Sequence, residues 1–406
     1  MGLVSPNTVT IIGWDGSALS LDANKALASA TLIVGSDRLL AAVPISEGAT
    51  IVPIQPLATA LETIAAHDGE VVVLASGDPG FFGLTRTLRA LGYQPKVLPA
   101  VSSISMLAAR LGEPWDDAAV LSAHGRDPRE AANAARALPA VFVLTSPDYG
   151  PAQLGEDLLG WTRMMIVGER LGHADETITT CTPAVAVARK WDDPNVVFVV
   201  DPTRRDLNRR RLTSNQPAAT SGPIALPEDE FVHRDSMITK WEVRAAVLSR
   251  LAPRFGSLIW DLGAGSGAVA VECAVLRAAV IAIDSDPKTK EVIEANALAK
   301  DVDVRVLIGA AENLLLDLPM PDAAFIGGGG LPVLDAVLTR NVPRIVATYA
   351  AIDRMTQARD TLMSAGYEVE GIQLQSSRMT DLPAGGFRLV AINPTFLLSA
   401  RKVGLQ

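Results

Sequence analysis

The sequence has few residues of the types that cross-link a fold or bind a metal. Only two of the 406 residues are cysteines, Cys181 and Cys273, and only four are histidines. Because the two cysteines are far apart, neither a disulfide framework nor a zinc-ligand spacing is present. We therefore expect a reducing, cytoplasmic location and no metal site.

Long apolar segments and a secretory leader are also missing. Apolar runs such as 71–74 and 196–200 are far shorter than the ~20 residues that a membrane helix requires. Residues 1–14 carry neither a basic region nor a small-residue cleavage site, and Val9 to Ile12 is typical of a first strand. We expect no signal peptide and no contact with a membrane.

Positive charge and aromatic side chains are scarce as well. The formal net charge is -9, and aromatic residues make up 5% of the chain. Proteins that bind nucleic acids draw affinity from lysine and arginine at phosphates and from aromatic stacking on bases. This composition disfavours a polynucleotide substrate.

What is present predicts a soluble α/β protein of more than one domain. A hydrophobic fraction of 49% is ordinary for globular proteins, and 406 residues exceed the size of one typical core. Short β-branched runs alternate with Ala- and Leu-rich helical patterns, which predicts parallel sheets covered on both faces. The pattern breaks in an arginine-rich, polar stretch that is more typical of a solvated linker than of an anion site. We predict a domain at 1–203, a linker at 204–222 and a second domain at 223–406.

The most specific motif lies in the second domain. Residues 258–267, LIWDLGAGSG, predict a strand that enters a glycine turn and then a helix. The spacing here is G-x-G-x-G, which lacks the third glycine of the G-x-G-x-x-G motif of dinucleotide sites. Asp261 stands two residues before the first glycine. A carboxylate there suits the ammonium and sulfonium of S-adenosylmethionine. Asp284, which ends the next strand, is placed to accept hydrogen bonds from both ribose hydroxyls. The alternative is a plain strand-turn-helix junction.

This order of elements resembles the class I methyltransferases. Residues 237–244 and 322–330 resemble the "MTKxEVR" and "FIGG" signatures of the CbiT-type precorrin decarboxylating methyltransferases, and the likeness covers nearly all of 223–406, including Asn393-Pro394. The resemblance implies a Rossmann-like domain whose S-adenosylmethionine pocket is lined by Thr239, Gly263, Gly265, Gly267, Asp284 and Ala311. It also implies that Gly328 and Gly329 leave space for a flat macrocycle, the alternative being a flexible loop.

The first domain carries a different set of motifs. A Gly-Asp-Pro turn at 77–79 follows a buried strand, at the edge where open α/β sheets bind ligands. The segments LPAVSS, SAHGR, LTSP and VGERLG follow in that order. This succession resembles the tetrapyrrole methylase family, and its HGR and ERLG elements match the CbiE-type members. One departure is the loop Gly13-Trp14-Asp15-Gly16, where most relatives have a Gly-Pro-Gly turn.

That second resemblance implies two α/β lobes that clasp a folded S-adenosylmethionine. The residues implied to line the pocket are Gly77, Asp78, Phe81, Ser102, Ser103 and Thr145. We predict that Glu169 and Arg170 pair as a structural bridge. For the carboxylates of a tetrapyrrole, the candidate ligands are His124, Arg126, Lys240, Arg244 and Arg378, because cationic side chains fit carboxylates. The alternative for His124 is a satisfied structural histidine, and for the other four it is a surface position without a specific role.

Together, and in this order, the two resemblances imply a fused enzyme of cobalamin synthesis. The implied reaction methylates precorrin-6Y at C5 and C15 and removes carbon dioxide from the C12 acetate, which gives precorrin-8. The first domain would act at C5, and the second at C15 and in decarboxylation. A reduced tetrapyrrole carbon is already nucleophilic, so alignment in a dry site is the main requirement, and no catalytic acid or base is identified.

Two other functions fit parts of the same pattern. One is an RNA-modifying methyltransferase, which the acidic, aromatic-poor composition disfavours. The other is a sensor that binds S-adenosylmethionine without catalysis, which would not need two unlike sites. We expect a small-molecule tetrapyrrole as the partner, no nucleic acid, and association into a homo-oligomer.

Overall fold

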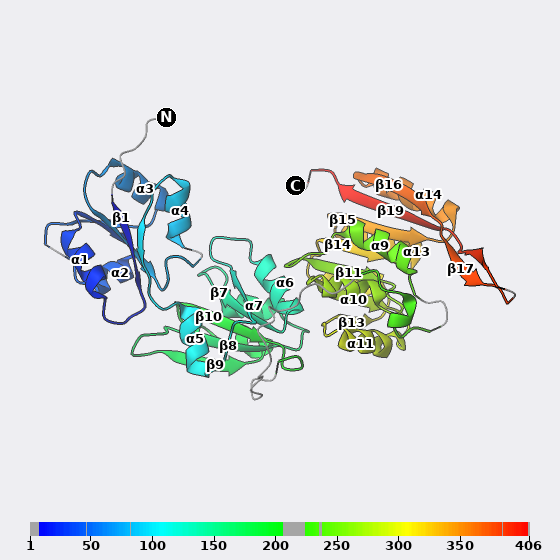
Figure 1. Cartoon of the computed structure of the whole chain (residues 1–406), viewed down its shortest axis with the longest axis horizontal. Helices are drawn as coiled ribbons and strands as arrows, with labels where there is room; N and C mark the ends of the chain where they lie inside the picture. The colour runs from blue at the N-terminus through cyan, green and yellow to red at the C-terminus, as the bar shows by residue number, and fades with distance from the viewer. Residues whose placement is uncertain are drawn as a thin grey trace. The chain divides into compact units, whose positions relative to one another are not determined.

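The chain is described from a computed structural model. The described residues are 8–45, 47–81, 83–205, 224–234, 238–383 and 385–404. Most of the expected linker, from residue 206 to 222, and Met237 of the expected N-terminal arm lie outside the described residues. The predicted α/β class is confirmed: the described residues form three large sheets and one separate two-stranded hairpin (Figure 1).

The first sheet has five parallel strands in the order β3-β2-β4-β1-β5. Its strands are β1 Val9–Trp14, β2 Leu32–Gly35, β3 Thr50–Pro53, β4 Val71–Ser76 and β5 Lys96–Leu98. Alternate residues face opposite cores: Ile11 packs into one apolar cluster and Ile12 into another. Helices α3 Leu57–Ala66 and α4 Leu84–Ala90 supply the first cluster, and α1 Leu21–Ser29 and α2 Asp37–Ala42 supply the second. Both faces are therefore covered, as continuous apolar strands predict.

A second five-stranded sheet has the order β6-β7-β10-β8-β9. Its strands are β6 Ala119–Ser122, β7 Ala140–Leu144, β8 Met164–Glu169, β9 Thr177–Cys181 and β10 Asn195–Val200. The helices in this part of the chain are α5 Ser103–Leu111, α6 Arg129–Ala137, α7 Pro151–Asp157 and α8 Pro183–Val187. Phe142 and Phe198 stack with ring centroids 4.1 Å apart, which anchors β7 against β10 in its core.

The third sheet has seven strands in the order β13-β12-β11-β14-β15-β19-β16. Its strands are β11 Leu258–Leu262, β12 Ala279–Asp284, β13 Arg305–Ile308, β14 Ala323–Ile326, β15 Arg344–Tyr349, β16 Tyr367–Leu374 and β19 Thr395–Lys402. The first five in spatial order pair in parallel, whereas β19 runs antiparallel to both of its neighbours. The chain leaves β11 toward β12 on one side and returns as β14 on the other, and such a switch point opens a crevice at the carboxyl ends of the strands.

Helices and a hairpin complete this third part of the chain. The helices are α9 Trp241–Leu251, α10 Ala268–Val275, α11 Thr289–Ala299, α12 Ala311–Leu314, α13 Gly330–Thr339 and α14 Ile352–Ser364, with short 3-10 turns η1 Glu228–Glu230 and η2 Leu315–Asp317. Strands β17 Ser377–Asp381 and β18 Phe387–Ala391 form the separate hairpin.

By contacts the chain divides into two compact units. Unit 1 contains residues 1–115, 166–180 and 190–197, and unit 2 contains 116–165, 181–189 and 198–406. This division does not follow the predicted boundary at residue 203.

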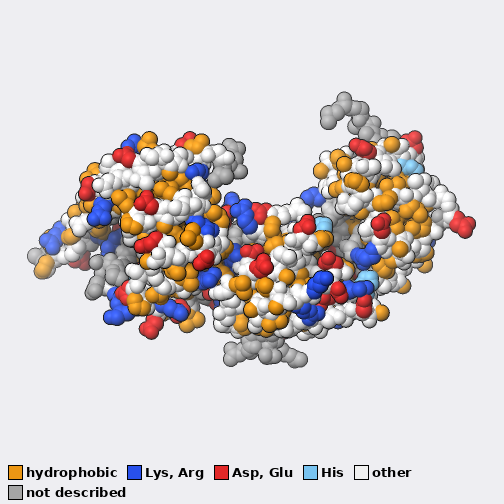
Figure 2. All heavy atoms as spheres, turned by 180° about the vertical axis from the view of Figure 1, so that it is seen from behind, with side chains coloured by type: hydrophobic (Ala, Val, Ile, Leu, Met, Phe, Trp, Pro, Cys, Tyr) orange, Lys and Arg blue, Asp and Glu red, His pale blue; other side chains and the backbone are white. Residues whose placement is uncertain are grey.

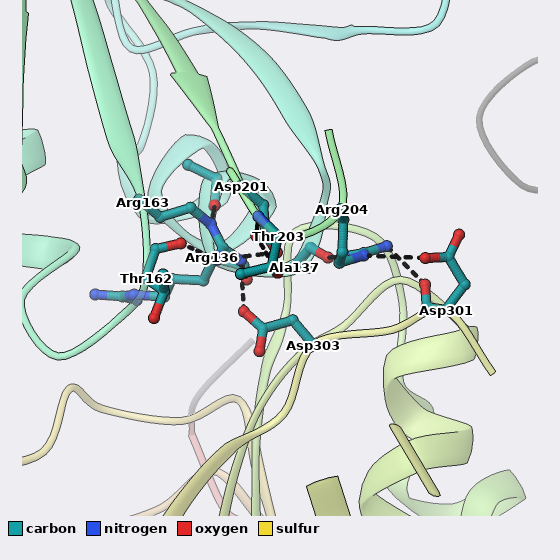
Figure 3. Close-up of polar contacts among 10 residues, drawn as sticks. Arg136, Ala137, Thr162, Arg163, Asp201, Thr203, Arg204, Asp301 and Asp303 are labelled. Atoms are coloured by element: carbon teal, nitrogen blue, oxygen red, sulfur yellow. Dashed lines mark hydrogen bonds and ion pairs between the residues drawn. The ribbon is translucent and has the colours of Figure 1, made fainter. Parts of the chain in front are cut away.

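Within unit 2, a buried arginine joins segments that are distant in sequence (Figure 3). The guanidinium of Arg163 lies 3.3 Å from Asp201 and 2.8 Å from Asp303, and its side chain is fully buried. Arg204 donates to the Ala137 carbonyl and to the Asp301 carbonyl at 2.9 and 2.8 Å. The first residue of the expected linker, Arg204, is therefore bonded to residues on both sides of the linker in sequence.

The surface carries both signs of charge. On the face in Figure 2, acidic and basic side chains are interspersed, without a continuous basic stripe. None of the helices in the described part of the chain has the length and apolarity needed to cross a membrane.

Candidate functional site

A cavity of about 730 Å³ opens at the switch point of the third sheet. Its walls come from the segments after β11, β12, β14 and β15, from the start of α9 and from residues before β19. Of the residues predicted for this half, the cavity is lined by Thr239, Lys240, Gly263, Gly265, Asp284, Gly328 and Gly329. Asn393 of the predicted Asn-Pro element lines it too. Two motifs that lie more than 150 residues apart in sequence, at Thr239 and Asn393, thus line the same cavity.

The glycine turn after β11 is held close to the loop after β14. Gly263, Gly265 and Gly267 have φ of +72°, +56° and +71°, a region that favours glycine. A Cβ on Gly263 would lie 2.6 Å from the Gly328 nitrogen, so the two loops approach this closely only because Gly263 has no side chain. A Cβ on Gly267 would instead meet Ile293 at 2.8 Å. Gly263 therefore shapes the cavity, whereas Gly267 permits α11 to pack beneath the turn.

Asp284 and Asp261 occupy different depths. Asp284 lines the cavity, where its Oδ2 accepts a hydrogen bond from the Gly265 amide at 2.8 Å and its Oδ1 accepts one from Asp286. Asp261 is buried under the turn, with Oδ2 accepting from the Ala270 amide at 2.9 Å. Burial raises the pKa of Asp261 to about 7, and the negative charge of Asp284 adds to the rise. Asp261 therefore does not face the cavity directly.

Two buried polar atoms near this site have no hydrogen-bond partner among the described residues. They are Oδ1 of Asp261 and the hydroxyl of Tyr349, a residue that lines the cavity. Burial raises the pKa of Tyr349 to about 12, so the hydroxyl is a neutral donor near neutral pH. Orphaned buried groups of this kind are costly, and for the Tyr349 hydroxyl a polar ligand in the cavity would relieve that cost.

Two predicted substrate ligands are engaged elsewhere. Arg244 is fully buried, donates to the carbonyls of Thr239 and Leu226, and lies 3.1 Å from Glu272. Arg378, on β17, donates to both Glu228 and Glu242. The structure therefore corrects our expectation for Arg244, because its position on the buried face of α9 makes it an anchor for the chain that precedes the helix. Ala311 is buried at the start of α12 and is not among the cavity residues.

In unit 1, the loops after β1, β4 and β5 meet at the carboxyl edge of the first sheet. The Gly77 amide donates to the Trp14 carbonyl at 2.8 Å, and a Cβ on Gly77 would lie 3.5 Å from Ser102 and 3.8 Å from Ser103. A Cβ on Gly13 would come within 2.2 Å of the Gly77 carbonyl. The glycine at position 13 is thus required for close approach of the β1 and β4 loops.

Individual predicted residues of this half have identifiable local roles. Ser102 caps α5, with its hydroxyl accepting from the Ser105 amide at 3.1 Å. Asp78 accepts from the Gly80 amide at 2.8 Å and so fixes the turn. Phe81 is half-buried. In unit 2, His124 and Arg126 are exposed, and Thr145 is half-buried after β7.

Asp15 is a residue that our sequence reasoning missed. It accepts hydrogen bonds from the amide and hydroxyl of Ser17 and, at 3.1 Å, from the Val101 amide. Burial raises the pKa of Asp15, but these bonds outweigh burial and leave the pKa below its ordinary value. Asp15 lines a cavity of about 330 Å³ between the loops that follow β1 and β5. The Asp-x-Ser spacing, typical of a side-chain turn, was the available signal.

The predicted bridge between Glu169 and Arg170 is wrong. Glu169 accepts from the Asp192 amide at 2.8 Å, and Arg170 pairs with Asp175 at 2.9 Å. Arg170 has a φ of +53°, which turns the chain out of β8 and carries the guanidinium toward the following loop.

Comparison with known proteins gives two family matches on this one chain. Residues 13–186 match the family described as tetrapyrrole (corrin/porphyrin) methylases, and residues 229–390 match the precorrin methyltransferase domain. The chain is 38% identical to a precorrin-6Y C(5,15)-methyltransferase [decarboxylating] from Sinorhizobium sp, over 81% of this chain and 80% of that protein.

Shorter proteins resemble each half separately. A probable cobalt-precorrin-6B C(15)-methyltransferase (decarboxylating) from Pyrobaculum aerophilum is 34% identical over 45% of this chain and 97% of its own length. A cobalt-precorrin-7 C(5)-methyltransferase from Salmonella typhimurium is 31% identical over 48% of this chain and 98% of its own length.

Proposed function

The chain belongs to the precorrin-6Y C(5,15)-methyltransferase (decarboxylating) family, and from this premise we propose that it methylates precorrin-6Y at C5 and C15 and decarboxylates the C12 acetate. The product is precorrin-8, an intermediate of cobalamin biosynthesis. The observation that carries this proposal is the match of both family domains, in this order, along a single chain.

We assign the two activities to the two predicted domains. Residues 1–203 methylate C5, and residues 223–406 methylate C15 and decarboxylate. The shorter relatives support this division, because the protein that resembles the first half is named for C(5) and the one that resembles the second for C(15). We further propose a cytoplasmic homo-oligomer that acts on a small-molecule tetrapyrrole and on no nucleic acid.

The methyl donor that we propose is S-adenosylmethionine, which supplies an electrophilic methyl group on a sulfonium. The residues of the second half fit it. Asp284 presents carboxylate oxygens at the end of β12, where a ribose binds in this kind of sheet. The glycine turn leaves backbone exposed to the cavity, and Asp261 with its unpaired oxygen lies beneath it. In the first half, Gly77, Asp78, Phe81, Ser102, Ser103 and Thr145 remain the proposed donor residues.

The contribution of the chain to catalysis is alignment and exclusion of water. The loop Gly327 to Gly329 leaves room on the cavity wall for a flat ring system. Lys240 lies on the same cavity, 3.8 Å from Glu228, and supplies a positive charge for a substrate carboxylate. Because the reacting carbon of a reduced tetrapyrrole is already nucleophilic, placing it in line with the donor in a dry site is sufficient.

Incubation of the full chain with precorrin-6Y and S-adenosylmethionine tests the proposal. Mass analysis should find a product that has gained two methyl groups and lost one carbon dioxide. A reaction mixture in which precorrin-6Y is recovered unchanged, with donor and folded protein present, would refute the proposed function.

A further inference from the structure

Beyond the carboxyl edge of the first sheet, one arginine contacts two side chains from other segments. Arg38, in the first turn of α2, donates through Nη2 to the Ser76 hydroxyl at 3.2 Å. Its Nη1 lies 3.3 Å from Nε2 of His173, which must accept the hydrogen bond because arginine only donates. Ser76 ends β4, and His173 lies between β8 and β9. The guanidinium therefore lies beside the Gly-Asp-Pro turn that we assign to the donor site.

The charge of Arg38 is not balanced by an acid among the described residues. Neither of its partners, a serine hydroxyl and a histidine ring, carries a negative charge. The acids of the nearby loop pair elsewhere, Asp175 with Arg170 at 2.9 Å and Glu176 with Arg110 at 2.6 Å. Partial burial lowers the pKa of Arg38, with no ion pair to offset the effect. A cation with spare donors at a ligand-binding edge favours an anionic ligand.

The loop that carries His173 is fixed in place. A Cβ on Gly172 would lie 2.2 Å from the Asp15 carbonyl, and a Cβ on Gly16 would lie 2.6 Å from the Gly172 carbonyl, so the two backbones are in close contact. The Gly172 amide also donates to Glu176, which Arg110 holds. Within unit 1, His173 is thus a rigid support for Arg38 and packs edge-on against Trp14 with ring centroids 6.2 Å apart.

We propose that Arg38 binds a peripheral carboxylate of the tetrapyrrole during methylation by the first half, with Ser76 and His173 orienting its guanidinium. This inference rests on the proposed function. Two donors of Arg38 are engaged, and the remaining N–H groups are available for a two-pronged hydrogen bond to an acetate or propionate. Trp14, which lines the adjacent cavity, offers an aromatic surface next to this anchor.

The test compares Arg38→Gln with the wild-type full chain, supplied with precorrin-6Y and S-adenosylmethionine. In the variant, we expect the tetrapyrrole KM of C5 methylation to rise about 10- to 100-fold, as the loss of a charged hydrogen bond predicts, with kcat little changed. A species with one added methyl and one carbon dioxide lost should accumulate, because the second half still acts. Arg38→Lys, which keeps the charge, should recover part of the affinity.

Arg89→Gln, an exposed arginine at the end of α4, is the matched control and should behave as wild type. An unchanged KM in Arg38→Gln, or a loss of donor binding to the first half, would overturn the inference. A wild-type chain that adds no methyl at C5 would refute the proposed function. Titration of precorrin-6Y without donor still tests the role of Arg38 in that case, because it measures tetrapyrrole binding alone. Loss of one of two tetrapyrrole sites in Arg38→Gln supports the anchor, and two unchanged sites contradict it.

Discussion

Asp261 shows how one buried carboxyl is affected by folding. It lies under the glycine turn with a single hydrogen bond, from Ala270, and its other oxygen has no partner among the described residues. Burial therefore raises its pKa from 3.8 to about 7. As pH rises through this window, the unfolded chain releases the proton first, so ionisation favours unfolding.

We predict that the free energy of unfolding of the wild-type chain falls relative to Asp261→Asn as pH rises from about 4 to about 7. The slope of the difference is at most about 1.4 kcal/mol per pH unit. Asparagine keeps an acceptor for the Ala270 amide and removes the titration. Urea unfolding without donor, at several pH values, measures this difference. A difference that stays constant with pH would show that Asp261 titrates normally.

Asp284 tests whether the two proposed donor sites are independent. Asp284→Ala removes both the acceptor that holds the Gly265 amide and the proposed ribose ligand. We expect donor binding to the second half to be lost, with C5 methylation by the first half still measurable on a substrate already methylated at C15. Calorimetric titration with S-adenosylmethionine checks the first expectation, with exposed Glu294→Gln on α11 as the control. Loss of both activities together would contradict independent sites.

At the scale of elements, the contact between the loops after β11 and β14 depends on the absence of a side chain at Gly263. Gly263→Ala adds a Cβ at 2.6 Å from the Gly328 nitrogen and at a φ of +72°. We expect a loss of about 2–4 kcal/mol in unfolding free energy from strain and overlap together, and weaker donor binding. Gly366→Ala is the matched control, since its φ is +82° and nothing lies within 4 Å of the added Cβ. It should cost only about 1 kcal/mol. Equal losses in urea unfolding would show that the loop contact adds nothing.

The elements were largely predictable from the sequence, whereas the direction of some side chains was missed. Apolar runs predicted the strands because such a run lies within a few neighbouring residues, and the glycine motif predicted the turn after β11. Our expectation for Arg244 was wrong because it relied on a sequence signature and did not consider which face of the helix the residue lies on. Residues 244, 247, 248 and 251 are spaced to lie on one face of α9, and all are buried. Arg38 was missed because its partners lie 38 and 135 residues away in sequence.

At the scale of the whole molecule, long-range polar contacts in unit 2 could not be predicted from spacing. Asn133 of α6 donates to the Gly256 carbonyl at 3.0 Å, 123 residues away, and Arg163 reaches Asp303. Such pairs are specified only when the chain is folded. They explain why contacts group residues 116–165 with the C-terminal part, although motifs assign them to the first domain.

Asp301 and Asp303 are close together in sequence, but one belongs to an exposed charge pair and the other to a buried one (Figure 3). Asp303 pairs with fully buried Arg163 at 2.8 Å, whereas the Asp301 side chain is 88% exposed and its carboxylate is 3.6 Å from Arg204. Removing a partner from a buried ion leaves charge that water does not screen, whereas an exposed pair contributes little. Asp303→Asn should therefore lower the unfolding free energy of the full chain by about 1–3 kcal/mol, and Asp301→Asn by less than about 0.5 kcal/mol. Chemical denaturation of the three proteins measures both losses. Equal small losses would mean that Asp201 alone satisfies Arg163, and that this contact does not stabilise unit 2.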